Sequence, residues 1–260
     1  MPVNYVSYWE TAAGQRMPPW IALALVSLRR ALGDRFTLLG RDDLVAVIDP
    51  AILDKAWGFE PLGFSMDKGI EAIVAKSDFI RMAYVHQHGG AWIDADSLLL
   101  GDPTAVLFPR GLERRLHWHS ECLFAALPGN PLLAEALASG LARDAHAWGN
   151  PGGIKDIVAR QPEGILPIAS DLFDPGYRPL YNFAGCEVMR RTDIAVGDFL
   201  QRKVSLLKLY NTWFKRTALR EESLAEFLAG GTLLARLFLH IEADRGYWLG
   251  EGEALIERCG

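Results

Sequence analysis

Apolar and polar residues recur along the chain with spacings that predict both strands and helices. The stretch Val3–Trp9 carries the Val and Tyr residues of a pleated strand, and Phe36–Leu39 predicts a second, shorter one. Between them, Pro18 and Pro19 precede a helical repeat of apolar residues that runs to about Leu32. Because strand and helix patterns alternate in this way, the sequence favours an α/β architecture.

The best-defined element is a long helix over Met66–His88. Its apolar residues recur with helical spacing, and no proline interrupts them. Gly89 and Gly90 follow, which is typical of the point where a chain leaves a helix. A short apolar strand, Ala91–Ile93, comes next and ends at two closely spaced aspartates. The pattern therefore predicts a helix, a glycine turn and a buried strand in direct succession.

The later part of the chain predicts shorter elements. Arg115–His119 and Cys122–Leu127 are expected to form an antiparallel pair, and Val204–Tyr210 a late strand. Amphipathic helices over Glu221–Phe227 and Thr232–His240 are expected to close the chain. No internal repeat, low-complexity segment or clear linker interrupts the pattern, so the sequence predicts one domain over residues 1–260.

Composition narrows the class of protein. Half of the 260 residues are apolar and the net charge is −5, which excludes disorder and argues against nucleic-acid binding through bulk positive charge. Three cysteines, Cys122, Cys186 and Cys259, lie far apart without a CxxC pair, so we expect neither a disulfide framework nor a zinc site. There is no signal-peptide pattern and no apolar run of about 20 residues, so we expect a cytoplasmic protein that does not cross a membrane.

Asp94 and Asp96 are the strongest candidates for chemistry. A buried strand delivers both carboxylates to its carboxyl end, where open α/β sheets bind their ligands. Two carboxylates at this spacing can reach one hard cation such as Mg²⁺ or Mn²⁺, which would offset the charge of a diphosphate leaving group. Taken alone, the D-x-D pattern is weak and favours an exposed turn with two aspartates.

A second pair of charged residues lies on the preceding helix. Asp78 and Arg81 are three residues apart, so their side chains share one face. They form either an ordinary helix ion pair or a site for sugar hydroxyls, which an acid and a base can bind together as acceptor and donor.

The combined motif resembles a known family of enzymes. Residues 75–81 read A-K-S-D-F-I-R, and residues 89–96 read G-G-A-W-I-D-A-D. This pattern, A-x-S-D-x-x-R followed by a helix and G-G-x-[WY]-hydrophobic-D-x-D, resembles DXD-containing glycosyltransferases. These include bacterial capsular-polysaccharide and lipooligosaccharide enzymes and the glycosyltransferase family 32 group. The match covers about residues 66–101, and Tyr8-Trp9-Glu10 adds to it.

The resemblance implies a fold and a reaction. The fold would be GT-A-type: α/β, with a Rossmann-like, mostly parallel central sheet flanked by helices. Residues 1–101 would be the nucleotide-sugar-binding half, and residues 102–260 the acceptor half with a closing C-terminal segment. The reaction would be metal-dependent transfer of a hexose, with retention, to a glycan or lipid-linked glycan of a cell-surface polysaccharide or lipopolysaccharide. A UDP-sugar is the favoured donor, and the sequence leaves GDP-mannose open as an alternative. The resemblance also allows a peripheral contact with the inner face of the membrane, and it leaves the oligomeric state open.

The resemblance assigns roles to residues of the main motif. Asp96 would ligate Mn²⁺ or Mg²⁺, and Asp94 would contact the donor ribose and support the metal ion through water. Asp78 and Arg81 would contact the donor. These four residues are the expected catalytic group of the enzyme.

Residues outside the main motif receive roles as well. Tyr8 or Trp9 would stack on the nucleobase. Asn211, as a further metal ligand, and Trp213 would lie on a late segment that closes over metal and diphosphate. Lys208, Lys215 and Arg216 nearby are either phosphate contacts or a solvated basic turn.

Two other interpretations remain open from the sequence. Residues 92–97 also fit the hydrophobic-D-x-D-x-[ST] motif of haloacid-dehalogenase-like phosphatases, in which the first Asp is the nucleophile. That family requires a later G-D-x-x-x-D motif, and here Gly197 and Asp198 are followed by Arg202 at the position of the last aspartate. A sugar-binding relative without catalytic activity is the other alternative, which the intact motif residues argue against.

Overall fold

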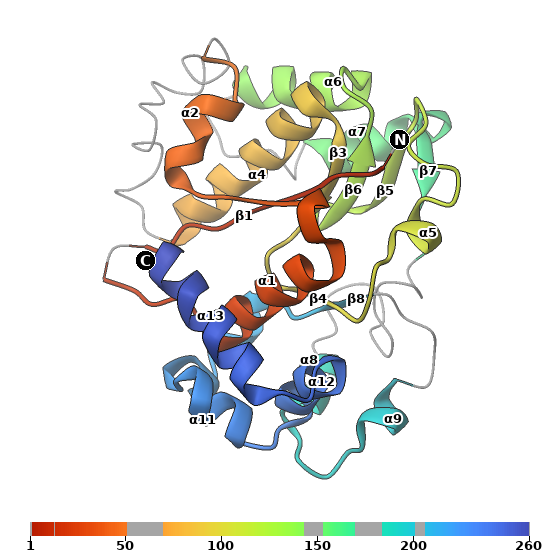
Figure 1. The fold of residues 1–260 in the computed structure, drawn as a ribbon. Helices are drawn as coiled ribbons and strands as arrows, with labels where there is room; N and C mark the ends of the chain where they lie inside the picture. The colour runs from red at the N-terminus through yellow and green to blue at the C-terminus, as the bar shows by residue number, and fades with distance from the viewer. Residues whose placement is uncertain are drawn as a thin grey trace. The chain divides into compact units, whose positions relative to one another are not determined.

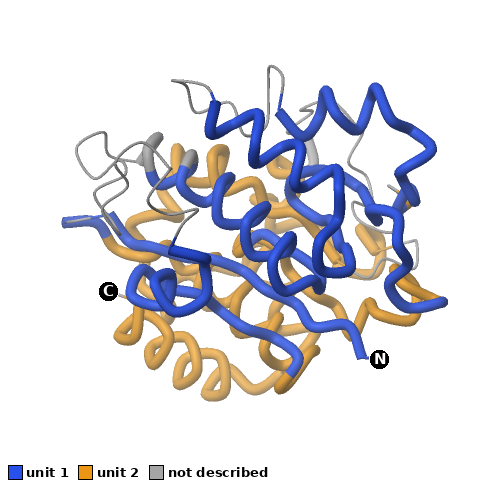
Figure 2. Tube along the Cα trace, turned by 90° about the horizontal axis from the view of Figure 1, so that it is seen from above, with its two compact units in different colours: residues 1–15, 35–94, 110–168 blue, residues 16–34, 95–109, 169–260 orange. Residues whose placement is uncertain are grey.

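The structure is a computed structural model that describes residues 2–12, 14–50, 70–142, 153–169, 184–200 and 206–259 (Figure 1). The chain divides into two compact units, which Figure 2 colours separately. Unit 1 comprises Met1–Gln15, Arg35–Asp94 and Arg110–Ile168, and unit 2 comprises Arg16–Asp34, Ala95–Pro109 and Ala169–Gly260. These units cut across the expected halves 1–101 and 102–260, and the assignment of a single domain stays a prediction.

Unit 1 contains a six-stranded sheet in the order β2-β1-β3-β6-β5-β7. The strands in that order are Phe36–Leu39, Tyr5–Tyr8, Gly90–Ile93, Leu123–Ala126, Leu116–Ser120 and Ile165–Pro167. The pairings of β1 with β2, β1 with β3, and β5 with β7 are parallel, whereas β6 runs antiparallel to both β3 and β5. The sheet is therefore mostly parallel, as expected, and the predicted antiparallel pair of β5 and β6 is confirmed.

Helices of unit 1 cover this sheet (Figure 1). They are α2 (Leu44–Val47), α4 (Ile70–His88), α6 (Pro131–Leu141) and α7 (Ile154–Arg160). The predicted helix over Met66–His88 is confirmed from Ile70 onward, and residues 66–69 lie outside the described residues. Helix α4 packs on β1, β3 and β6, and it buries Phe79, Ile80 and Met82 in the core of the unit.

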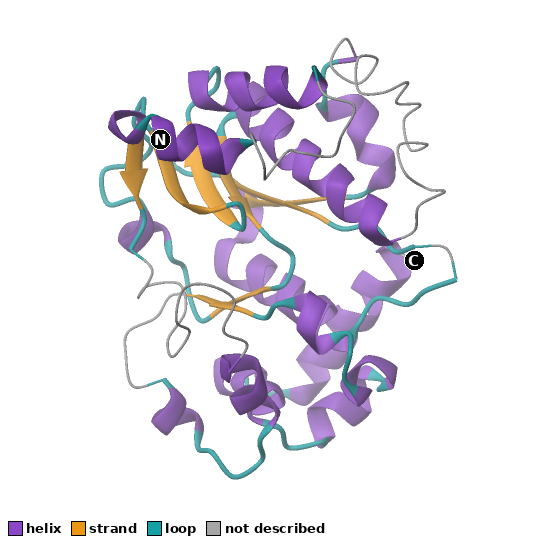
Figure 3. Cartoon of the chain, turned by 180° about the vertical axis from the view of Figure 1, so that it is seen from behind, coloured by secondary structure: helices purple, strands orange, loops and turns teal. Residues whose placement is uncertain are grey.

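Unit 2 is mainly helical (Figure 3). Its helices are α1 (Pro19–Leu32), α5 (Thr104–Leu107), α8 (Ala184–Arg190), α9 (Val196–Phe199), α10 (Asn211–Phe214), α11 (Leu224–Ala229), α12 (Leu233–Ile241) and α13 (Arg245–Cys259). Two short strands, β4 (Ser97–Leu99) and β8 (Leu206–Lys208), pair antiparallel. The predicted helix to Leu32 and the predicted late strand are confirmed by α1 and β8.

Two predictions about the end of the chain were wrong. The helix expected at Glu221 begins at Leu224, because Ser223 and Glu226 form a capping box that fixes its first turn. The chain also does not close with α12, since α13 follows it. Gly246, Gly250 and Gly252 weaken the helical signal of α13, but the missing Cβ of Gly252 lets Leu224 pack closely there.

The glycine pair before β3 is required by the backbone. Gly89 and Gly90 have φ angles of +70° and +97°, a region that other residues rarely adopt. A Cβ on Gly90 would lie 2.8 Å from the backbone oxygen of Asn4, beside which β3 pairs with β1. A Cβ on Gly89 would lie 2.7 Å from the ring of Pro128. The G-G of the motif therefore lets α4 turn directly into the central strand.

We expect Gly90→Ala to destabilise the protein by about 2 kcal/mol or more, because the added methyl group meets backbone and the φ angle is unfavourable. Urea unfolding measures the change. Gly101→Ala is the matched control, since nothing lies within 4 Å of its Cβ position and its φ is ordinary. Equal stability of the two variants would contradict this account of the glycine pair.

Candidate active site

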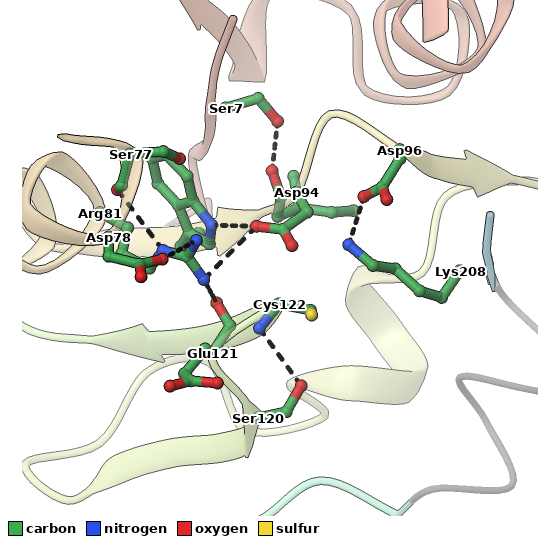
Figure 4. A network of polar contacts seen from close by, with 12 residues as sticks. Ser7, Ser77, Asp78, Arg81, Asp94, Asp96, Ser120, Glu121, Cys122 and Lys208 are labelled. Atoms are coloured by element: carbon green, nitrogen blue, oxygen red, sulfur yellow. Dashed lines mark hydrogen bonds and ion pairs between the residues drawn. The ribbon is translucent and has the colours of Figure 1, made fainter. Parts of the chain in front are cut away.

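The central parallel strands of unit 1 bring two candidate residues to the same edge of the sheet. Because β1 and β3 are parallel neighbours, their carboxyl ends meet at one edge, where Trp9 follows β1 and Asp94 follows β3. The Ser7 hydroxyl donates a hydrogen bond to the Ile93 carbonyl and joins the two strand ends (Figure 4). The Trp9 N–H donates to the Leu39 carbonyl at 3.0 Å, which ties the end of β1 to β2.

Arg81 is the centre of a polar cluster at this edge (Figure 4). Its guanidinium lies 2.5 Å from Asp78 Oδ1 and 3.7 Å from Asp94 Oδ1. It also donates to the Glu121 carbonyl at 2.6 Å. The Arg81 side chain is only 9% exposed, against 25% for Asp78 and 17% for Asp94. The structure thus brings together three of the four expected catalytic residues through one buried cation.

Trp92 is a member of this cluster that the sequence analysis left without a role. Its indole N–H donates to Asp94 Oδ1 at 2.7 Å, and the Arg81 guanidinium lies 5.5 Å from its ring centroid. Trp92 therefore holds Asp94 by a hydrogen bond and Arg81 by a cation–π contact. The signal was available in the sequence, because side chains two residues apart on a strand point to the same face.

Burial and charge set the protonation of the cluster. Burial raises the pKa of the Asp78 carboxyl from 3.8 to about 6, even though the Arg81 guanidinium lowers it. Burial alone lowers the pKa of Arg81, but the charges of Asp78 and Asp94 more than offset this and raise it. Arg81 is consequently always cationic, whereas Asp78 titrates close to neutral pH, which is typical of a functional site.

This pKa predicts how stability depends on pH. The folded state binds a proton on Asp78 more tightly than the unfolded chain, so the ionised carboxyl disfavours folding above about pH 6. The neutral variant Asp78→Asn should melt at or above the wild-type temperature at pH 7.5. As the pH falls from about 6 toward 4, the melting temperature of the wild type should rise relative to that of Asp78→Asn, as measured by circular dichroism.

Asp193 offers a control of opposite sign. A hydrogen bond from Arg191 lowers the pKa of Asp193, so Asp193→Asn should be the less stable protein at pH 7.5, with the difference shrinking in acid. If the wild type instead loses stability relative to Asp78→Asn on acidification, the ion pair with Arg81 outweighs the burial of Asp78, and the predicted sign is wrong.

Asp96 belongs to unit 2, and its contacts come from the last residue of β8 and the segment that follows it. The Lys208 ammonium forms an ion pair with Asp96 Oδ1 (Figure 4). The Asn211 backbone N–H donates to Asp96 Oδ2 at 2.8 Å. The Leu209 N–H donates to the Asp96 carbonyl at 2.7 Å. Asp96 is therefore held at both carboxylate oxygens and at its backbone by residues more than a hundred positions further along the chain.

The late residues named from the sequence lie in unit 2, and Asn211 contacts this carboxylate directly. Asn211 begins the short helix α10, a turn of helix that the sequence pattern did not predict, and its Oδ1 accepts from the Trp20 indole at 3.2 Å. Trp213 is half-buried against Phe214, and the Arg190 guanidinium lies 5.8 Å from its ring centroid. The predicted roles of Asn211 and Trp213 toward a donor stay predictions.

The Asp96 region is suited to a hard divalent cation by the chemistry of its donor atoms. The Asp96 carboxylate and the Asn211 side-chain oxygen are ligand types that Mg²⁺ and Mn²⁺ prefer. Asp96 accepts a hydrogen bond from the Asn211 backbone N–H, and the Asn211 side-chain oxygen accepts one from the Trp20 indole. Such outer hydrogen bonds orient the ligands of a metal ion. Within the described ranges, no group of three or more His, Cys, Asp or Glu side chains is arranged to hold a metal ion. Substrate oxygens and water would have to complete such a site.

The aromatic residues after β1 differ in exposure. Tyr8 is 4% exposed in the core of unit 1, and its hydroxyl donates to Glu10, which also forms an ion pair with the buried Lys76. Trp9 is half-buried, and its indole donates to the Thr11 hydroxyl at 3.1 Å. Of the two candidates for stacking on a nucleobase, Trp9 has the more accessible ring, and the stacking itself stays a prediction.

Two further observations concern the class of protein. The three cysteines form no disulfide with one another. In the part of the chain that the structure describes, no helix combines the length and the apolar character needed to span a bilayer.

The fold defines the chain as an α/β protein of the GT-A type, as the sequence resemblance implied. The solved structure of the glycosyltransferase GlyE from Streptococcus pneumoniae TIGR4 matches it with a TM-score of 0.51 and 13% identity, over 96% of this chain and 63% of the GlyE chain. The chain thus spans less than two thirds of GlyE, and at this identity the match concerns the fold alone.

Weaker likenesses were found to two other structures. The apo form of GlyE gives a TM-score of 0.49 and 14% identity, over 98% of this chain and 64% of that one. The PaToxG glycosyltransferase gives 0.46 and 11%, over 63% of this chain and 70% of that one. No protein-family model and no curated protein matches the sequence.

Proposed function

We propose that this protein is a metal-dependent glycosyltransferase that uses a nucleotide-sugar donor. The observation that carries the proposal is the Arg81 cluster, in which one buried guanidinium joins Asp78 of the S-D-x-x-R helix to Asp94 of the D-x-D strand. An ordinary ion pair between two residues of one helix would not need Asp94 as a third partner. The GT-A-type fold and the resemblance of the motif to DXD-containing glycosyltransferases support the same assignment.

The residues of unit 1 bind and orient the donor in this proposal. Asp78 and Arg81 present an acceptor and a donor of hydrogen bonds, the combination that sugar hydroxyls require. Asp94 binds the ribose, and its carboxylate is held ready by Trp92. Trp9 stacks on the nucleobase at the carboxyl end of β1. Such a preorganised set binds the donor without rearranging charged groups.

The residues of unit 2 hold the metal ion. Asp96 is the principal ligand and Asn211 contributes its side-chain oxygen. The family resemblance gives Asp94 a supporting contact with the ion through water. A bound Mn²⁺ or Mg²⁺ supplies charge stabilisation to the departing nucleoside diphosphate. Trp213 and the basic residues Lys215 and Arg216 close over the diphosphate.

The donor and acceptor belong to the proposal as well. We infer a UDP-hexose donor, transfer with retention, and a glycan or lipid-linked glycan acceptor of a surface polysaccharide or lipopolysaccharide, all from the family resemblance. The place of action would be the cytoplasm, at the inner face of the membrane where lipid-linked acceptors are available.

A thermal-shift panel tests the proposal. UDP, GDP, UDP-glucose, UDP-galactose and GDP-mannose are each added with and without Mn²⁺, since a ligand that binds only the folded state raises the melting temperature. We expect a Mn²⁺-dependent shift with the uridine compounds. If no nucleotide shifts the melting temperature but Mg²⁺ with a phosphate mimic does, a phosphatase becomes the better proposal and the transferase is rejected.

Two variants locate the nucleotide in the same panel. Trp9→Ala should lower the affinity for UDP about tenfold, since stacking of a base on an aromatic ring contributes about 1–3 kcal/mol. Trp118→Ala, at a half-buried Trp of β5, is the control and should bind UDP as the wild type does. Equal affinity of Trp9→Ala and wild type would remove Trp9 from the site.

A further inference from the structure

Lys208 is a charged residue at a buried position. It ends the short strand β8, where Leu206, Leu207 and Leu209 around it are all buried, and the Lys208 side chain is itself only 5% exposed. A buried ammonium is costly unless it is paired, and its partner here is Asp96, 12% exposed. The two charges meet at one end of the β4–β8 ladder, because Lys208 pairs with Ser97 and Asp96 directly precedes Ser97.

The backbone after Lys208 is shaped around the same carboxylate. Tyr210 has a φ of +44°, and it is the only non-glycine residue with positive φ among those described. Tyr210 lies between Leu209, whose N–H donates to the Asp96 carbonyl, and Asn211, whose N–H donates to the Asp96 carboxylate. Strain of this kind persists only where the surroundings hold it, and it often marks a functional site. Residues 208–211 therefore bind Asp96 through one ammonium group and two backbone N–H groups.

We propose that Lys208 is the resident counter-ion of Asp96, which a divalent metal ion must displace from the carboxylate, so that Lys208 keeps the affinity for the metal ion alone low. The proposal rests on the proposed function, because it takes Asp96 as the metal ligand. An ammonium group has no lone pair and cannot join the ligands of the ion. Two cations at one carboxylate oxygen repel each other, so the ion pair and the metal–carboxylate bond compete.

The competition also predicts how metal and donor act on each other. A nucleoside diphosphate offers Lys208 a new anionic partner once it leaves Asp96. Binding of the diphosphate should therefore raise the affinity for the metal ion, and by linkage the metal ion should raise the affinity for the diphosphate by the same factor. Without Lys208 this mutual enhancement should fall, because the carboxylate is already available.

Titration with Mn²⁺ alone, followed by the EPR signal of the free ion, tests the inference on the full chain without any nucleotide. We expect Lys208→Met to bind Mn²⁺ about tenfold tighter than the wild type or more. Lys208→Arg, which keeps the charge, should bind as weakly as the wild type. The matched control is Arg245→Met, which removes one positive charge from an exposed position of the same unit and leaves Asp96 and Lys208 unchanged. It should change the affinity less than about twofold.

The outcomes separate this inference from the proposed function. The role of Lys208 is overturned if Lys208→Met binds Mn²⁺ no more tightly than the wild type, or if Arg245→Met gains as much affinity as Lys208→Met. If Lys208→Met is too unstable to titrate, the Lys208→Gln variant decides in the same way. Should Asp96→Asn bind Mn²⁺ as well as the wild type, the ion is not on Asp96, and the inference falls. Failure of the proposed function appears elsewhere, as the lack of any nucleotide-dependent shift in melting temperature.

Discussion

Asp96→Asn should abolish metal-dependent sugar transfer, lowering kcat/KM by at least about 100-fold. Loss of a residue that only hydrogen-bonds to a metal ligand costs up to about 100-fold, so loss of the ligand itself should cost at least as much. The amide keeps the size of the carboxylate but loses the charge that attracts the ion. The measurement is transfer or hydrolysis of the donor that the thermal-shift panel identifies, at saturating Mn²⁺. Activity within tenfold of the wild type would show that Asp96 is not the metal ligand.

The same substitution should destabilise the protein. It leaves the buried Lys208 ammonium without its carboxylate partner, and breaking such a pair costs about 3–5 kcal/mol. The double variant Asp96→Asn/Lys208→Met removes both charges, so most of the lost stability should return while activity stays lost. Urea unfolding of the two single variants and the double variant gives the coupling energy. A double variant as unstable as Asp96→Asn would mean that the backbone bonds to Asp96, and not the ion pair, hold this segment.

The fold was predictable where local patterns are strong. The long apolar repeat before Gly89 and the short strand after Gly90 follow directly from the residues, because helix and strand periods differ clearly there. The prediction was wrong where local and distant interactions disagree. Helix α13 carries three glycines, and it persists because Trp248 is fully buried and contacts Phe238, with ring centroids 5.4 Å apart. A packed tryptophan thus outweighs a low helix propensity.

The contacts among the predicted site residues were predictable only in part. The spacing of Asp78 and Arg81 on a helix predicts that the two meet, and the structure adds Asp94 as a third partner. The pair of Asp96 and Lys208 could not be found in this way, because 112 positions separate them and only the pairing of β4 with β8 brings them together. A single Lys between buried leucines was the one local sign that an acidic partner had to exist.

The buried pair of Lys76 and Glu10 illustrates the same limit. Lys76 occupies the variable position of the A-x-S-D motif, yet its side chain is fully buried and bound to Glu10 after β1. Burial lowers the pKa of Lys76, while the Glu10 carboxylate raises it. This pair ties the helix that carries Asp78 and Arg81 to the segment directly after β1 that contains Trp9, which explains how two separate motifs keep one geometry.

Arg81→Lys is expected to reduce kcat/KM about 100-fold and to lower stability by about 1–3 kcal/mol, although the charge is kept. The planar guanidinium serves Asp78, Asp94 and the Glu121 carbonyl at once and lies over the Trp92 ring. A single ammonium group cannot reproduce this fork, so at least one buried acceptor loses its donor. Donor kinetics and urea unfolding of the purified variant measure the two effects.

The control for this prediction is another ion pair in the same unit. Arg160 lies 3.0 Å from Glu135, but the two side chains are 60% and 41% exposed, so Arg160→Lys should change stability by less than about 0.5 kcal/mol and leave turnover unchanged. Near-normal kinetics of Arg81→Lys would reduce Arg81 to a structural partner of Asp78. A loss of stability without a loss of turnover would lead to the same conclusion, because a residue that orients the donor must affect the reaction and not only the fold.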